Sequence, residues 1–323
     1  MWATFLMIMA AKTGPERVVV VPRNGYVNWL QALASAAILA HQWGSRLDVL
    51  WEHQEVAPAG LSDLVETSRL TAGTIDPGQV TEILGANHDD MPRYLSLDPP
   101  RGTAFLAGHD RGEQAFMEEL QQTVSRGPLI RTVVIVAGGK FHLPGQIDFD
   151  ARRRDYYRNM PWKPSITSPV DQLSATVPSY VGLHIRETDR SRDAPTPRRV
   201  ERSLRQVCEE SGLGDVFIAA DTSSARDSWR QRISTFGLTP HTHADVVLDR
   251  TDPRAAQVAI SDWLTLGNAQ GLVYSSASSF GQEAAVMCGN PGLTRGLRST
   301  WLHRLSRDAV RVSEQGLRRL GAK

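Results

Sequence analysis

Near the N-terminus, the order of hydrophobic and polar residues predicts a strand, a helix and a second strand. The β-branched run Arg17–Val21 predicts a buried parallel strand, and an apolar helical pattern follows from about Asn28 to Trp43. Gly44 predicts the end of this helix, and Leu47–Trp51 predicts the next strand. These segments together predict a βαβ unit with a right-handed crossover.

The pattern is weaker after Trp51. Residues 52–100 contain short helical pieces among Pro, Gly and Asp. Further on, Thr103–Gly108 and Ile130–Gly138 predict strands, and Glu113–Ser125 predicts the helix between them. From Lys140 to Ser168 the periodicity breaks, and a mixture of basic, aromatic and proline residues predicts an irregular connection between two domains.

Regular alternation returns after Pro178. Four strand patterns are each followed by a helix pattern. The strands are predicted at residues 180–185, 215–221, 244–249 and 271–275, and the helices at 198–212, 224–237, 253–270 and 279–289. This order predicts a doubly wound parallel sheet. We therefore expect an α/β protein with two Rossmann-like domains, residues 1–160 and residues 161–323, and a cleft between them.

Composition narrows the class of protein. A chain of 323 residues fits two domains, and its net charge of +1 provides no general attraction to nucleic acid or anionic membranes. Cys208 and Cys288 cannot build a disulfide framework, and neither has zinc-ligand spacing, so we expect a cytoplasmic protein. The apolar N-terminal run of 11 residues is too short to span a membrane and lacks the basic region of a signal peptide.

Polar residues gather where three predicted strands end, in the segments HIRETD, AADTSS and YSSASSFG. The planar guanidinium of Arg186 suits a pair of phosphate oxygens, and His184 lies two residues before it on the same side of the strand. The serines at 275, 276, 278 and 279 precede a helix, whose first amides favour an anion. Asp221 can accept two N–H donors, such as those of a guanine edge. Together these groups predict a site for a nucleoside diphosphate.

Each of these features also has a purely structural interpretation. A serine at a helix start is commonly a cap, and an aspartate after a strand commonly caps the next helix. A histidine within a strand is commonly a core residue, and Asp189 and Arg190 could form an ordinary surface ion pair. The case for a ligand depends on their common placement at successive strand ends.

The motifs at these strand ends resemble those of the GDP-fucose-dependent fucosyltransferase superfamily. YVGLHIRETDR resembles peptide I of the α1,6-fucosyltransferases and nodulation fucosyltransferases, and VFIAADTSS resembles the second motif. DWLTLGNAQGLVYSSASSFGQEAA is similar to the third motif, most closely that of protein O-fucosyltransferases. YYRNMPWKPS resembles the linker before peptide I, and RNGYVNWLQ resembles the start of the acceptor domain.

This resemblance implies a GT-B fold and an inverting transfer that needs no metal and no cofactor. Arg186 corresponds to the arginine that binds the β-phosphate of the donor, and His184 and Asp221 correspond to contacts with guanosine. Ser278, Ser279 and Phe280 correspond to the backbone phosphate cradle. Asp262 corresponds to the acidic residue that braces the motif arginine. The acceptor-side loop corresponds to Asn24, Tyr26 and Asn28.

The chain also departs from the family pattern at three positions. Glu187 replaces the second arginine of peptide I, and Tyr26 stands where the acceptor loop usually has a glycine. Ala194 occupies the position of the proposed general base of the α1,6-enzymes. The candidate bases are therefore Asp193, Asp189 and Glu187, in that order.

We expect an enzyme that transfers a sugar, L-fucose by default, from a GDP-sugar to a hydroxyl of a glycan, peptide or small natural product. One alternative is an inactive protein of the same fold that binds a nucleotide or sugar. Another is a different Rossmann-type enzyme, such as a nicotinamide oxidoreductase. That class requires a G-x-G-x-x-G segment after the first strand, and RNGYVN does not supply it.

Overall fold

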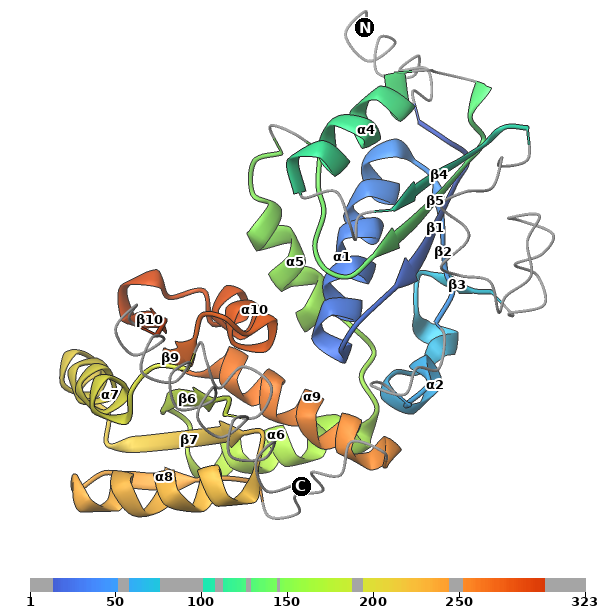
Figure 1. Cartoon of the computed structure of the whole chain (residues 1–323). Coiled ribbons are helices and arrows are strands. Elements are labelled where there is room, and N and C mark those ends of the chain that lie inside the picture. The colour runs from blue at the N-terminus through green and yellow to red at the C-terminus, as the bar shows by residue number, and fades with distance from the viewer. Residues whose placement is uncertain are drawn as a thin grey trace, which may run out of the picture. The chain divides into compact units, whose positions relative to one another are not determined.

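The computed structural model describes residues 14–51, 58–75, 101–107, 113–125, 129–143, 146–187, 194–243 and 252–299. The chain separates into two compact units, Met1–Lys163 with Arg250–Ala256, and Pro164–Asp249 with Gln257–Lys323. Each unit contains a five-stranded sheet in its described part, and every strand pair in both sheets is parallel (Figure 1).

The sheet of the first unit has the strand order β3-β2-β1-β5-β4. Its strands are β1 (Arg17–Pro22), β2 (Arg46–Val49), β3 (Gly73–Thr74), β4 (Thr103–Ala107) and β5 (Thr132–Ala137). The four consecutive valines of β1 are all at most 2% exposed. A continuous apolar run of this kind is typical of a parallel strand that is covered on both faces.

Helix α1 is the main helix of the first βαβ unit. It spans Tyr26–Trp43, so it begins two residues before the expected Asn28, and Trp29, Leu30 and Leu33 are fully buried. Gly44 ends it in the left-handed conformation with φ of 63°, which confirms the predicted stop. The other helices in the described part of this unit are α2 (Leu61–Leu64), η1 (Thr67–Arg69), α4 (Glu113–Ser125) and α5 (Phe149–Arg158).

The sheet of the second unit has the strand order β10-β9-β6-β7-β8. Its strands are β6 (Val181–Ile185), β7 (Asp215–Ala220), β8 (Thr239–His241), β9 (Gly271–Ser275) and β10 (Thr294–Leu297). β7 and β8 extend the sheet on one side of β6, whereas β9 and β10 extend it on the other. The order therefore reverses between β6 and β9, and ligands of such sheets bind at the carboxyl ends of the strands beside this switch point.

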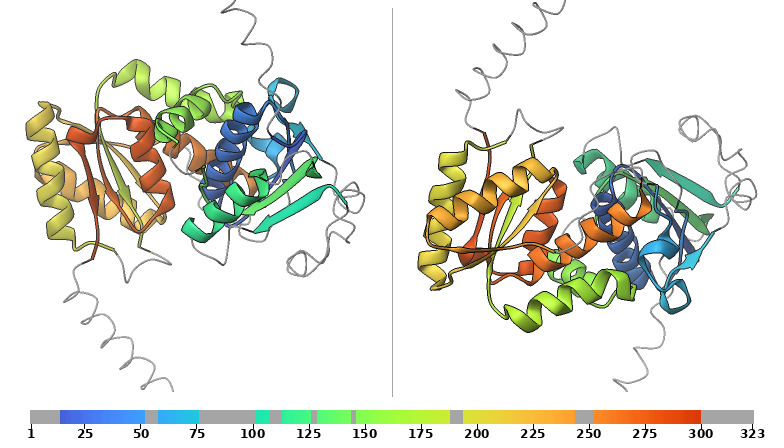
Figure 2. Two further views of the ribbon diagram at one scale, coloured as in Figure 1. Left: turned by 90° about the horizontal axis from the view of Figure 1, so that it is seen from above. Right: turned by 90° about the horizontal axis from the view of Figure 1, so that it is seen from below.

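Helices cover both faces of the second sheet. They are α6 (Pro164–Thr176), α7 (Pro197–Ser211), α8 (Ser223–Thr235), α9 (Pro253–Asn268) and α10 (Ser279–Cys288), with the short η5 (Pro291–Leu293) before β10. Figure 2 shows α7 and α10 on opposite sides of the sheet. The buried residues of α7 are Val200, Leu204, Val207 and Cys208, whose spacing places them on one helix face.

The structure confirms the expected α/β fold, with a Rossmann-like parallel sheet in each half of the chain. The stretch from Lys140 to Ser168 contains the change from the first unit to the second, but the prediction that it is irregular is wrong, because it contains α5 and the start of α6. The strand predicted at 244–249 lies outside the described residues. The short strands β3, β8 and β10 were not predicted.

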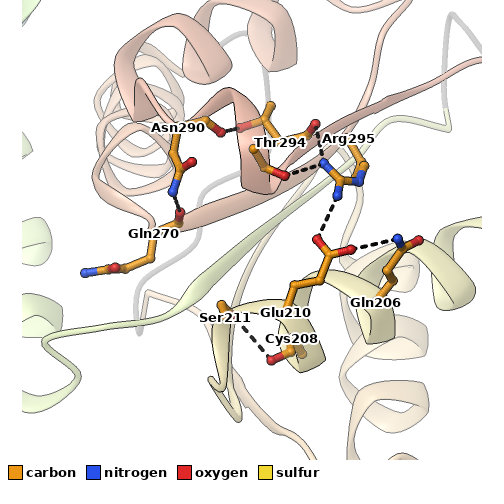
Figure 3. Close-up of polar contacts among 9 residues, drawn as sticks. Gln206, Cys208, Glu210, Ser211, Gln270, Asn290, Thr294 and Arg295 are labelled. Carbon is orange, nitrogen blue, oxygen red and sulfur yellow. Dashed lines mark hydrogen bonds and ion pairs between the residues drawn. The ribbon is translucent and has the colours of Figure 1, made fainter.

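Polar contacts join α7 to the amino-terminal edge of the second sheet. Arg295, near the start of β10, forms an ion pair with Glu210 of α7 at 2.7 Å (Figure 3). Glu210 also accepts a hydrogen bond from Gln206, and Asn290 donates one to the carbonyl of Gln270. These contacts lie at the opposite end of the strands from the predicted site.

Candidate functional site

Arg186 and Ser278 meet across the switch point of the second sheet. All five residues of β6 are buried, and Arg186 is the first residue after this strand. Ser278 lies three residues after the end of β9, the neighbouring strand, and is 1% exposed. The guanidinium Nη1 of Arg186 donates a hydrogen bond to the Ser278 hydroxyl at 3.3 Å. The structure therefore brings together two of the predicted donor-binding residues.

Helix α10 begins at this contact without a side-chain cap. Ser278 is the N-cap residue, but its side chain makes no capping hydrogen bond. The first helical hydrogen bond runs from the amide of Gln282 to the carbonyl of Ser278. The amides of Ser279, Phe280 and Gly281 precede that bond, so the helix supplies them no acceptor. Amides and a helix dipole in this arrangement favour an anion.

His184 is packed against the first turn of α10. The residue is 6% exposed, and its ring stacks on the ring of Phe280 with a centroid distance of 5.1 Å. A Cβ atom on Gly281 would lie 2.8 Å from His184 Nδ1, so only glycine allows this close approach. Sequence reasoning missed Gly281, although its place directly after SSF was a usable signal.

Burial, and then the nearby charge of Arg186, lower the pKa of His184 to about 3. The ring is therefore neutral at physiological pH. Its Nδ1 atom has no hydrogen-bond partner among the described residues. A buried nitrogen without a partner is uncommon in folded proteins and is explained if a ligand supplies the missing hydrogen bond.

Asp221 connects the ends of β6 and β7. Both of its carboxylate oxygens lie 3.1 Å from the backbone amide of Glu187, which donates to them. The interpretation of Asp221 as the cap of α8 is wrong, because Thr222 is the N-cap and accepts a hydrogen bond from the Ala225 amide. Asp221 instead fixes the backbone that follows Arg186.

The structure describes only part of the predicted catalytic segment. Glu187 is exposed at the carboxyl edge of the sheet. Asp189, Arg190 and Asp193 lie outside the described residues. Ala194 is described, and it is 6% exposed.

Asp262 is a residue of α9 and belongs to a polar cluster with His243, Thr265 and Arg226. Its carboxylate is 3.8 Å from Nε2 of His243, which also lies 2.9 Å from the Thr265 hydroxyl. Burial raises the pKa of Asp262 to about 8, while the charge of Arg226 opposes this shift. Burial lowers the pKa of His243. The contacts of Asp262 are thus with this cluster, and its expected role as the brace of Arg186 stays a prediction.

The predicted acceptor-side residues surround the end of β1 in the first unit. Asn24 has a positive φ of 73°, and its side-chain amide donates to the carbonyl of Gly138 beyond β5. Tyr26 is the first residue of α1, and its hydroxyl accepts a 2.6 Å hydrogen bond from the Ala59 amide. Asn28 lies in the first turn of α1 and is half-buried. The tyrosine that replaces the usual glycine therefore holds a neighbouring loop.

The described part of the chain contains neither a metal-binding cluster nor a membrane-spanning helix. Within the described ranges, no group of three or more His, Cys, Asp or Glu residues is arranged to hold a metal ion. None of the helices in the described part of the chain is long and apolar enough to cross a membrane.

Comparison with solved structures finds the same fold among fucosyltransferases. NodZ from Bradyrhizobium, a fucosyltransferase, matches with a TM-score of 0.56 and 16% identity over 84% of this chain and 91% of that one. A mutant of Arabidopsis thaliana FUT1 in complex with GDP has a TM-score of 0.55 and 15% identity, covering 85% of this chain and 69% of that one. POFUT1 in complex with GDP-fucose has a TM-score of 0.51 and 11% identity, covering 88% and 98%.

These matches confirm the predicted resemblance to the fucosyltransferase superfamily at the level of the fold. No model of a protein family matches the chain, and no curated protein matches its sequence.

Proposed function

We propose that this chain transfers a sugar from a GDP-sugar, GDP-L-fucose by default, to a hydroxyl group of an acceptor. The observation that carries the proposal is the contact between Arg186 and Ser278 at the uncapped start of α10. It joins an arginine fork to a helix N-terminus at the switch point of a parallel sheet, where nucleotides bind. The fold shared with GDP- and GDP-fucose-bound structures supports the same assignment.

In the proposed reaction, an acceptor oxygen attacks the anomeric carbon from the face opposite the diphosphate. The bond between that carbon and the β-phosphate oxygen breaks, its electron pair stays on GDP, and the acceptor proton passes to a general base. The departing diphosphate gains negative charge, which Arg186 and the first amides of α10 stabilise. These positive groups replace a metal ion, so the transfer is expected to continue in EDTA.

The nucleoside end of the donor is assigned to His184 and Asp221. Asp221 lies at the carboxyl end of β7, and a carboxylate can accept hydrogen bonds from two adjacent N–H donors. That capacity suits the adjacent N–H groups of guanine. The neutral ring of His184, whose Nδ1 has no hydrogen-bond partner in the described part of the chain, is assigned a further contact with guanosine.

The acceptor is assigned to the first unit, near Asn24, Tyr26 and Asn28. The general base is proposed among Asp193, Asp189 and Glu187, of which only Glu187 lies in the described ranges. Glu187 directly follows Arg186 and therefore lies at the same edge as the proposed diphosphate site.

A nucleotide screen followed by a turnover assay tests this function. GDP is expected to raise the melting temperature more than UDP, ADP or TDP at equal concentration, because only guanine matches the proposed acceptors. GDP release from several GDP-sugars is then measured in EDTA, with and without candidate acceptors. A larger shift with UDP or TDP would contradict the guanine site. A GDP-specific shift without turnover of any GDP-sugar would instead support an inactive binding protein.

A further inference from the structure

A second arginine, Arg298, is anchored on the same turn as Arg186. Arg298 is the first residue after β10, and its Nε donates to the Ser276 hydroxyl at 3.2 Å. Ser276 belongs to the turn between β9 and α10, and its amide donates to the carbonyl of Leu297 at 2.9 Å. The side chain of Arg298 is therefore attached to the segment that leads into the uncapped start of α10.

The two arginines approach this turn from opposite flanks. In the sheet, β9 lies between β6 and β10. Arg186 follows β6 and contacts Ser278, whereas Arg298 follows β10 and contacts Ser276. The two serines are separated by one residue, so their Cα atoms are at most about 7 Å apart. An anion seated on this turn would lie between two guanidinium groups.

The charge of Arg298 has no acidic partner within the part of the chain that the structure describes. Its side chain is exposed. Arg199 lies beside it in the first turn of α7, where its Nη1 donates to the Arg298 carbonyl at 2.7 Å. That turn contains no acidic residue, and a cation at a helix N-terminus is unfavourable on its own. Arg298, Arg199 and the starts of α7 and α10 thus concentrate positive charge at the carboxyl end of the sheet.

We propose that Arg298 is a second diphosphate-binding residue of the donor site. This inference rests on the proposed GDP-sugar function. The α10 start is equivalent to about half a positive charge, and Glu187 adds a negative charge to the same edge. Arg186 alone therefore leaves the charge of a diphosphate only partly offset. Arg298 supplies the missing cation from β10, while the carbonyl contact with Arg199 holds its backbone in place.

The test compares Arg298→Gln with Arg295→Gln in the full chain. Arg295 is on β10 and Arg298 directly follows this strand, so the two residues are about 10 Å apart, and each substitution removes one positive charge. Arg295 points to the amino-terminal edge and pairs with Glu210 (Figure 3). Calorimetric titration with GDP and with guanosine, which lacks both phosphates, separates diphosphate contacts from effects on the nucleoside site.

Arg298→Gln is expected to weaken GDP binding by about 10- to 100-fold, as loss of a charge-assisted hydrogen bond does. Guanosine affinity should not change, and Arg295→Gln should leave GDP affinity unchanged. Arg298→Lys, which keeps the charge but loses the fork, should give an intermediate loss. The inference is overturned if Arg298→Gln binds GDP as tightly as Arg295→Gln does, or if it weakens GDP and guanosine equally. If the unmodified chain does not bind GDP, the proposed function itself is wrong.

Discussion

Ser278 directs its side-chain oxygen to Arg186 instead of to the helix that it begins. A serine at this position usually accepts a hydrogen bond from an amide in the first helical turn, and losing that bond costs about 1 kcal/mol. Here the contact with Arg186 replaces it and leaves the amides of the first turn to an external anion. This single residue therefore links the arginine fork and the helix N-terminus.

Removal of Arg186 should affect turnover more than folding. Arg186→Ala is expected to reduce turnover of the GDP-sugar by about 10²–10³-fold, because the lost contact strengthens as the bond to the diphosphate breaks. Arg186→Lys should restore only part of the activity, since a point charge cannot reproduce the guanidinium fork. Steady-state kinetics of both variants, with circular dichroism to check folding, measure this effect.

Glu187→Ala is the matched control for Arg186→Ala, because the two positions are adjacent and Glu187 is exposed. Asp193 and Asp189 rank ahead of Glu187 as the general base, so removal of this negative charge near the phosphates should reduce turnover far less than Arg186→Ala does, or tighten GDP binding. If Glu187→Ala loses more activity than Arg186→Ala, then Glu187, and not Arg186, is the main catalytic residue at the end of β6.

Asp262 makes stability depend on pH in an unusual direction. Its pKa is raised from 3.8 to about 8 by burial, so the folded chain retains a proton that the unfolded chain loses above about pH 4. This group therefore stabilises the fold most at low pH, and its contribution declines as pH rises from about 4 to about 8. The groups that face it are His243 and Arg226.

Asp262→Asn removes this titration and retains the shape of the side chain. The free energy of unfolding of the variant, relative to that of the unmodified chain, is expected to increase steadily between pH 5 and pH 8. Taking the difference largely cancels the titration of His243, which is present in both proteins. Urea denaturation at several pH values provides the measurement. A difference that stays constant over this range would show that the carboxyl group is already ionised at pH 5.

The face of helix α7 that packs on the second sheet should account for much of the stability of that unit. Leu204 is fully buried in the core cluster of α7 and the sheet, and Leu204→Ala is expected to reduce the free energy of unfolding by about 2–5 kcal/mol. Arg202 lies on the exposed face of the same helix, and Arg202→Ala should change stability by less than about 0.5 kcal/mol. Equal losses in urea denaturation would contradict the assigned packing face.

The helices and strands that could not be predicted are those whose sequences show no regular spacing of apolar residues. In α5 the buried positions are Phe149, Arg153 and Tyr157, so an arginine occupies the middle of the stripe and hides the helical pattern. β8 is an edge strand of three residues around Pro240, and in β10 only Leu297 is buried. Long buried strands such as β1 and β6 were predictable because both of their faces are covered.

At the scale of the whole molecule, strand order determines which polar residues can meet. Ligands of parallel sheets bind at the carboxyl ends of the strands, and on this basis the sequence predicts that Arg186 and Ser278 lie at one edge. The structure shows that the two side chains are in contact. Arg298 was not predicted, because the short strand that precedes it was missed. The bond from the Glu187 amide to Asp221 could not be predicted either, since it depends on the register between β6 and β7.

The most direct test of the central claim is a crystal structure of the protein with bound GDP. The account predicts that diphosphate oxygens lie within hydrogen-bonding distance of the Arg186 guanidinium and the amides of Ser279 and Phe280. The guanine is predicted beside Asp221 at the same carboxyl edge. GDP bound elsewhere on the chain, or bound at this edge with its phosphates turned away from Arg186 and the start of α10, would contradict the account.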